Sequence, residues 1–159
     1  KKICRTRDAG IEVVERAAEI FETSLTATAI RYAEVTDDAV AVIVSTGPTI
    51  DYCFMSEAMK SLPKIEWPKK GMPVPISTAT KAFNANVSRV AAGERDESEI
   101  DVRIWLGGSK RETVSEQIIG LGRYRKTLTV LASNSIGEGE VSDEEEEDRL
   151  LDSWTPKFR

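Results

Sequence analysis

The sequence contains no histidine and only two cysteines, Cys4 and Cys53, among its 159 residues. Without histidine there is no HExxH zinc site, no Ser-His or Cys-His catalytic pair and no histidine pH switch. Two cysteines are too few for a thiolate zinc cage or a disulfide framework. These absences argue against an enzyme, and we expect no catalytic residue, no metal and no cofactor.

Long apolar runs are also missing, since none approaches the ~18 residues of a membrane span. No signal peptide opens the sequence, and two lone cysteines suit a reducing compartment. We therefore expect a cytoplasmic protein with no membrane partner. The chain begins at Lys1 rather than Met, which suggests a piece of a longer protein.

Positive charge is slightly scarce, with 22 basic residues against 27 acidic ones and a net charge of −5. Six of the acids are consecutive at residues 143–148, in a tail that we place at residues 137–159. Residues 1–142 alone hold 19 basic and 20 acidic groups. A nearly neutral body carries no electrostatic footprint for nucleic acid. We interpret the acidic run as a solvated helix end, because nothing in it defines a cation's coordination geometry.

The first 36 residues have the apolar spacing of a helix pair. One helix is predicted from Ile11 to Glu22, and a second follows Ser24, whose side chain suits an N-cap. A DNA-binding interpretation puts a recognition helix here, with candidate DNA contacts at Thr26, Thr28 and Arg31. The alternative is a helical linker that packs on a neighbouring domain. We favour the linker, because the second helix has few basic residues for phosphate contacts.

Residues 37–136 predict an α+β fold with about five antiparallel strands and one long helix. The expected strands are residues 39–45, 50–55, 100–106, 113–119 and 127–132, and the expected helix is 77–92, after an irregular loop at 61–75. Two strands, a helix and three strands follow the element order of PAS- and GAF-like sensor domains. The sheet needs a cover for its apolar face, and the long helix is the predicted cover. Its stripe of Phe83, Val87 and Val90 is expected to pack on these sheet residues: Val42, Val44, Val102, Ile104 and Val130.

A sensor pocket between sheet and helix is the main candidate site. Its candidate residues are Tyr52, Cys53, Trp67, Phe83, Trp105 and Tyr124. Trp105 is the strongest, because in a strand it alternates with Val102, Ile104 and Leu106 and points away from them. For each residue the alternative is ordinary core or edge packing, and for Cys53 we prefer a buried structural thiol to a redox reporter.

A small basic cluster near the last turn contains Arg123, Arg125 and Lys126. It suits an anionic ligand or an acidic partner segment, although plain solvation is the default for charges in a turn.

Six short segments, spread from about residue 11 to residue 159, resemble in order the region that follows the peptidase domain of ImmA/IrrE-type zinc metallopeptidases. These segments are the run 21–36, Ala-Val-Ala-Val-Ile-Val-Ser at 39–45, Gly-Met-Pro-Val-Pro-Ile-Ser at 71–77, Ile-Trp-Leu at 104–106, Tyr-Arg-Lys-Thr-Leu-Thr-Val-Leu at 124–131, and Leu-Leu-Asp-Ser-Trp-Thr-Pro-Lys-Phe-Arg at 150–159. The HExxH helix of that family is absent here.

The resemblance implies a helix-turn-helix-like linker at 1–36, a GAF-like sensor domain at 37–136 and an acidic tail. It further implies a non-catalytic region that regulates a peptidase domain of the same parent protein, with cleavage of a transcriptional repressor as the output. The expected partners are that peptidase domain and an unidentified small molecule or protein. A DNA-binding regulator and a homodimerisation module are the alternatives.

Overall fold

The computed structural model describes residues 11, 14–16 and 24–133, and the acidic tail lies outside them. The fold is α+β, with five antiparallel strands in the order β2-β1-β5-β4-β3. The strands are β1 Ala39–Thr46, β2 Thr49–Met55, β3 Arg95–Asp101, β4 Thr113–Gly120 and β5 Thr127–Ser133. The helices are α2 Leu25–Val35, α3 Glu57–Lys60, α4 Ala79–Asn84, α5 Val87–Ala91, α6 Val102–Leu106 and the single 3₁₀ turn η2 Gly122–Tyr124.

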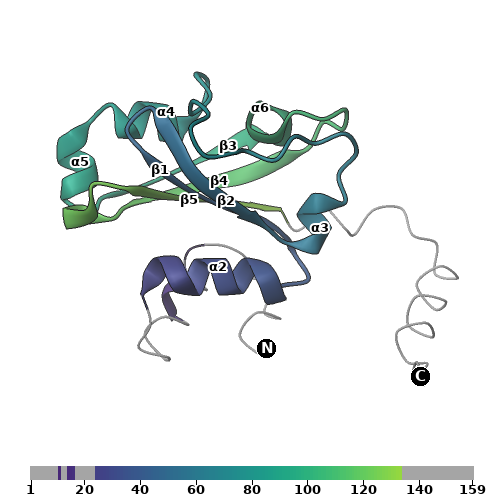
Figure 1. The fold of residues 1–159 in the computed structure, drawn as a ribbon, viewed down its shortest axis with the longest axis horizontal. Coiled ribbons are helices and arrows are strands. Elements are labelled where there is room, and N and C mark those ends of the chain that lie inside the picture. The colour runs from purple at the N-terminus through teal and green to yellow at the C-terminus, as the bar shows by residue number, and fades with distance from the viewer. Residues whose placement is uncertain (1–10, 12–13, 17–23, 134–159) are drawn as a thin grey trace, which may run out of the picture.

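Helices cover both faces of the sheet, with α2 on one face and the shorter helices on the other (Figure 1). This arrangement explains why the central strand β1 is apolar along its length. Its residues Val40, Val42 and Val44 pack towards α2, whereas Ala39, Ala41 and Ile43 pack towards α3 and α6. The predicted strands at 39–45, 50–55, 113–119 and 127–132 are confirmed, as is the irregular loop at 61–75.

Helix α2 supplies a cover that the sequence interpretation gave to residues 77–92. Ser24 caps it as predicted, accepting a hydrogen bond from the Ala27 N–H at 3.2 Å. Its buried face includes Ala29, Tyr32 and Ala33, in one cluster with the sheet residues Val42, Val44 and Val130. The expectation that these three valines pack under residues 77–92 was therefore wrong, because they lie on the opposite face of the sheet.

The predicted long helix at 77–92 is also wrong, since this segment forms two short helices, α4 and α5. Asn84 ends α4 because its buried side chain donates to Ser45 Oγ and to the Gly47 carbonyl, at 3.0 and 2.9 Å. Asn86 then starts α5 by accepting a hydrogen bond from the Arg89 N–H. The break turns Val87 outwards, where it is 67% exposed.

The predicted strand at 100–106 is wrong beyond its first two residues, because β3 spans Arg95–Asp101 and residues 102–106 form α6. Asp101 ends β3 and caps α6, because its side chain accepts a hydrogen bond from the Arg103 N–H at 3.0 Å. The buried residues of this helix, Val102, Trp105 and Leu106, have helical spacing and lie in one apolar cluster, whereas Ile104 is exposed. Trp105 therefore points with Val102 and Leu106 rather than away from them.

We predict that Phe83→Ala destabilises the fold by about 3–5 kcal/mol. Phe83 is fully buried against Val90 and Ile118, with the Arg89 guanidinium 4.8 Å from its ring centroid, so the truncation leaves a cavity. Denaturant unfolding measures the loss, and Val87→Ala on the exposed side of α5 is the matched control. A loss below about 0.5 kcal/mol for Phe83→Ala, typical of surface sites, would contradict this packing.

Candidate functional site

The six predicted pocket residues do not line one pocket. Cys53 and Trp105 share an apolar cluster on the α6 face of the sheet, and Trp67 lies beside them at the edge of β2. The other three lie elsewhere: Phe83 in a separate cluster, Tyr52 on the α2 face, and Tyr124 in η2 with 65% of its surface exposed. Only Cys53, Trp67 and Trp105 therefore remain candidates for a common site.

The cluster that holds Trp105 lies between the sheet and a cover made of α3, α6 and parts of the 61–75 loop. We call it the Trp105 layer. Besides Trp105 and Cys53 it contains Met55 of β2, Met59 of α3 and Leu106 of α6, all buried. Unbranched methionine side chains adapt their shape to irregular neighbours. The layer is thus apolar and lined in part by side chains that can repack.

Trp105 brings one polar group into this layer. The residue is only 5% exposed, and its indole N–H has no hydrogen-bond acceptor among the described residues. Buried indole N–H groups usually find an acceptor, and an unsatisfied buried donor costs about 1–3 kcal/mol. The Trp105 layer therefore presents one free hydrogen-bond donor in apolar surroundings.

Short segments hold the cover of this layer in place. The Glu66 N–H donates to the Leu106 carbonyl at 2.7 Å, and Ile65 bridges to Gly107. Gly108 has a φ of +87° and approaches the Pro63 carbonyl so closely that a Cβ would lie 2.9 Å from it. The C-terminal end of α6 is thereby fastened to residues 63–66.

Trp67 closes the outer side of the layer. Its indole N–H donates to the Cys53 carbonyl at 2.9 Å, and the Lys60 ammonium lies 5.1 Å from its ring centroid. The side chain is 43% exposed and does not belong to the buried cluster.

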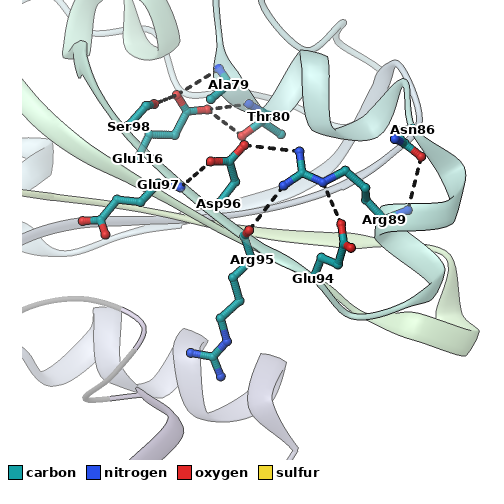
Figure 2. A network of polar contacts seen from close by, with 10 residues as sticks. All are labelled: Ala79, Thr80, Asn86, Arg89, Glu94, Arg95, Asp96, Glu97, Ser98 and Glu116. Atoms are coloured by element: carbon teal, nitrogen blue, oxygen red, sulfur yellow. Dashed lines mark hydrogen bonds and ion pairs between the residues drawn. The ribbon is translucent and has the colours of Figure 1, made fainter.

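A second polar group is buried on the same side of the sheet, at Glu116 of β4 (Figure 2). Its carboxylate accepts hydrogen bonds from the Ala79 and Thr80 N–H groups at 3.2 and 2.9 Å. The hydroxyls of Thr80 and Ser98 also donate to it, at 2.6 and 3.3 Å. These four bonds use the carboxylate's acceptor capacity, so Glu116 fastens α4 to the sheet.

Sequence reasoning did not single out Glu116, although a signal was present. In the alternating strand 113–119, Glu116 has the same phase as Val114 and Ile118. A carboxylate on the apolar side of a strand must be buried with partners, and the fold confirms that position.

An open cleft of about 410 Å³ lies beside the edge strand β3. It is lined by Ile11, Arg95, Asp96, Glu97, Gln117 and Ile118. Arg95 pairs with Glu15, and the Gln117 side chain accepts a hydrogen bond from the Ile11 N–H at 2.7 Å. The cleft is therefore lined by charged and polar side chains together with two isoleucines, unlike the Trp105 layer.

The candidate DNA contacts on α2 are not presented together. Thr28 is buried, and its hydroxyl donates to the Ser24 carbonyl at 2.9 Å, so the expectation that it lies on an exposed face is wrong. Thr26 is half-buried, and Arg31 is exposed but paired with Glu34 at 2.9 Å. The reason is that α2 turns its apolar side, Thr28 included, towards the sheet.

The predicted basic cluster is divided as well. Lys126 pairs with Asp51 of β2 at 2.7 Å, whereas Arg125 is exposed at a φ of +54°. The side chain of Arg123 lies outside the described residues. The internal pairing of Lys126 removes one of the three cations that an anionic partner would need.

No protein-family model matches this chain, and no curated protein matches it either. Within residues 11, 14–16 and 24–133, no group of three or more His, Cys, Asp or Glu is placed to hold a metal ion. In the same part of the chain, no helix has the length and apolar character to cross a membrane.

We predict that Cys53 does not react with Ellman's reagent in the folded protein. Burial raises the pKa of its thiol to about 12, so at pH 8 only about one thiol in ten thousand is a thiolate. The experiment uses the Cys4→Ser variant, in which Cys53 is the sole cysteine, and denaturant supplies the reactive control. Rapid stoichiometric labelling of the folded variant would contradict a buried, protonated thiol.

Proposed function

We propose that this chain is the non-catalytic, GAF-like sensory region of a protein of the ImmA/IrrE type. In this proposal the Trp105 layer binds a small, largely apolar molecule that carries one hydrogen-bond acceptor. The observation that carries it is the unpartnered indole N–H of Trp105, a donor inside an otherwise apolar cluster. The order of strands and helices and the sequence resemblance support the sensory assignment.

The chemistry of recognition follows from the layer itself. An acceptor oxygen on the ligand takes the Trp105 N–H and removes the cost of the unsatisfied donor. The apolar body of the ligand packs among Met55, Met59 and Leu106, as ligands do in mainly apolar sites with few polar groups. Entry displaces part of the cover, whose helices α3 and α6 have only four and five residues.

A route from the ligand to the rest of the protein runs along β3. Asp101 is both the last residue of β3 and the N-cap of α6, so a shift of α6 acts directly on this strand. At the other end of β3, Arg95 pairs with Glu15 near the N-terminal side of the chain. In the resembling family the peptidase domain precedes this side. Ligand binding is therefore proposed to bias the peptidase domain through β3 and Glu15.

The alternative of a DNA-binding regulator has less support. Its helix α2 packs one side on the sheet, buries Thr28 and offers Arg31 already paired with Glu34. A helix without free cations gains little from the phosphates that supply most non-specific DNA affinity.

We predict that acetophenone binds the Trp105 layer and that α-methylstyrene, which has the same shape but a methylene in place of the carbonyl oxygen, binds more weakly. The readout is the Trp105 indole N–H resonance in ¹H–¹⁵N NMR spectra, which a new hydrogen bond shifts downfield. Bound acetophenone also raises the unfolding temperature through its selective affinity for the folded chain.

Trp105→Phe is the matched control, because it keeps an aromatic side chain and removes the N–H. We expect this variant to lose the preference for acetophenone over α-methylstyrene. If neither compound shifts the Trp105 resonance, or if both bind equally well to the unmodified chain, the proposed acceptor site is wrong.

A further inference from the structure

The two edge strands of the sheet differ in whether another segment of the chain pairs with their outer backbone groups. At the β2 edge, the 61–75 loop supplies partners: Gly71 N–H donates to the Ile50 carbonyl, and Ile50 N–H donates to the Met72 carbonyl. The Trp67 indole N–H donates a hydrogen bond to the Cys53 carbonyl on the same edge. At the β3 edge no described segment runs alongside the strand. An uncovered strand edge is a template for pairing with another extended chain.

The register identifies which backbone groups of β3 point outwards. Gly120 N–H donates to the Glu94 carbonyl and Val102 N–H donates to the Glu112 carbonyl, so even-numbered residues bond to β4. The odd-numbered residues therefore direct their N–H and C=O groups away from the sheet.

Local side chains satisfy two of these outward groups, the Arg95 carbonyl and the Glu97 N–H. Arg89 of α5 donates to the Arg95 carbonyl, and the Asp96 side chain accepts a hydrogen bond from the Glu97 N–H, as Figure 2 shows. Among the described residues nothing bonds the Glu97 carbonyl, either backbone group of Glu99, or the Asp101 N–H. The open edge thus runs from Glu97 to Asp101.

The odd-numbered side chains along this open edge are acidic. Glu97 and Glu99 are exposed, and among the described residues no cation forms an ion pair with either carboxylate. The neighbouring cations are already used, since Arg89 pairs with Glu94 and Asp96, Arg95 with Glu15, and Arg103 with Asp101. The 410 Å³ cleft beside Asp96 and Glu97 leaves room next to the start of the open edge.

We infer that the β3 edge from Glu97 to Asp101 binds an extended segment of a partner protein that carries Lys or Arg at alternate positions, which adds to the sheet as a sixth strand. Backbone hydrogen bonds to Glu99 give the affinity, and basic side chains opposite Glu97 and Glu99 give the specificity. A second copy of this chain is a poor occupant, because antiparallel pairing of two β3 strands sets these carboxylates against each other.

The test titrates the full 159-residue chain with a fluorescein-labelled peptide of sequence Gly-Lys-Val-Lys-Val-Lys-Gly and follows fluorescence anisotropy. A second peptide carries N-methyl groups on alternate backbone amides, which keeps the charge and blocks strand pairing. We expect saturable binding of the first peptide, weakened at least about tenfold by the N-methyl groups, an amount that corresponds to roughly 1.4 kcal/mol.

Three variants assign the binding to β3. Glu99→Lys reverses a charge at the open edge, and Glu57→Lys makes the same change on α3 as a matched control. Glu99→Pro removes an outward N–H that makes no bond to β4, a substitution that edge strands tolerate. We expect both Glu99 variants to lose about tenfold or more in affinity and Glu57→Lys to change it by less than about twofold. Circular dichroism checks that each variant is folded.

Three results would overturn the inference. The first is no saturable binding of the unmodified peptide. The second is binding that Glu99→Lys weakens but that N-methylation and Glu99→Pro leave unchanged, which means a charge contact without strand addition. The third is a dimer that Glu99→Pro dissociates, which assigns the edge to a second copy of the chain.

Discussion

A buried carboxylate anchors α4, one of the helices that cover one face of the sheet. A carboxyl group away from water is stable only when hydrogen bonds replace its solvent, and Glu116 receives four of them. The donors come from α4 and from Ser98 of β3, and Thr80 extends the network to Thr129 of β5 at 2.9 Å. The Glu116 side chain of β4 therefore ties the N-terminal end of α4 to the three neighbouring strands β3, β4 and β5.

The position of α4 sets the surfaces around it. Because α4 ends at Asn84, α5 starts afresh and brings Arg89 over Phe83 and onto Glu94 and Asp96. Arg89 thereby covers the beginning of the β3 edge and leaves the part after Asp96 open. At the far end of the same strand, Asp101 starts α6 and the cover of the Trp105 layer. The proposed ligand site and the proposed strand-docking edge thus share β3, so a movement of α6 is expected to alter both.

Much of the sheet is predictable from sequence because β1 and β5 are buried on both faces and read as continuous apolar runs. Strand β3 is not, because an edge strand with charges on both faces lacks the apolar alternation of a strand. The break between α4 and α5 is hidden as well, since it depends on contacts of Asn84 with residues about 40 positions away.

For the candidate site, Trp105 and Cys53 were identified but Glu116 was not. Trp105 was chosen on a strand periodicity that the structure replaces with a helix. Alternation along the predicted strand 50–55 already implied that the adjacent residues Tyr52 and Cys53 point to opposite faces, so grouping them in one pocket was an avoidable error.

The most direct test of this account is a double-mutant cycle between Glu116→Gln and Thr80→Val, measured as free energies of unfolding. Glutamine has one acceptor oxygen and one NH₂ group, and the NH₂ group faces N–H and O–H donors that need an acceptor. The Glu116→Gln variant alone should therefore have a free energy of unfolding lower by at least about 2 kcal/mol. If the carboxylate anchors α4 through Thr80, the two losses should be coupled by about 1 kcal/mol or more. Additive losses, with coupling below about 0.3 kcal/mol, would show that Glu116 and α4 are held independently and would contradict the account.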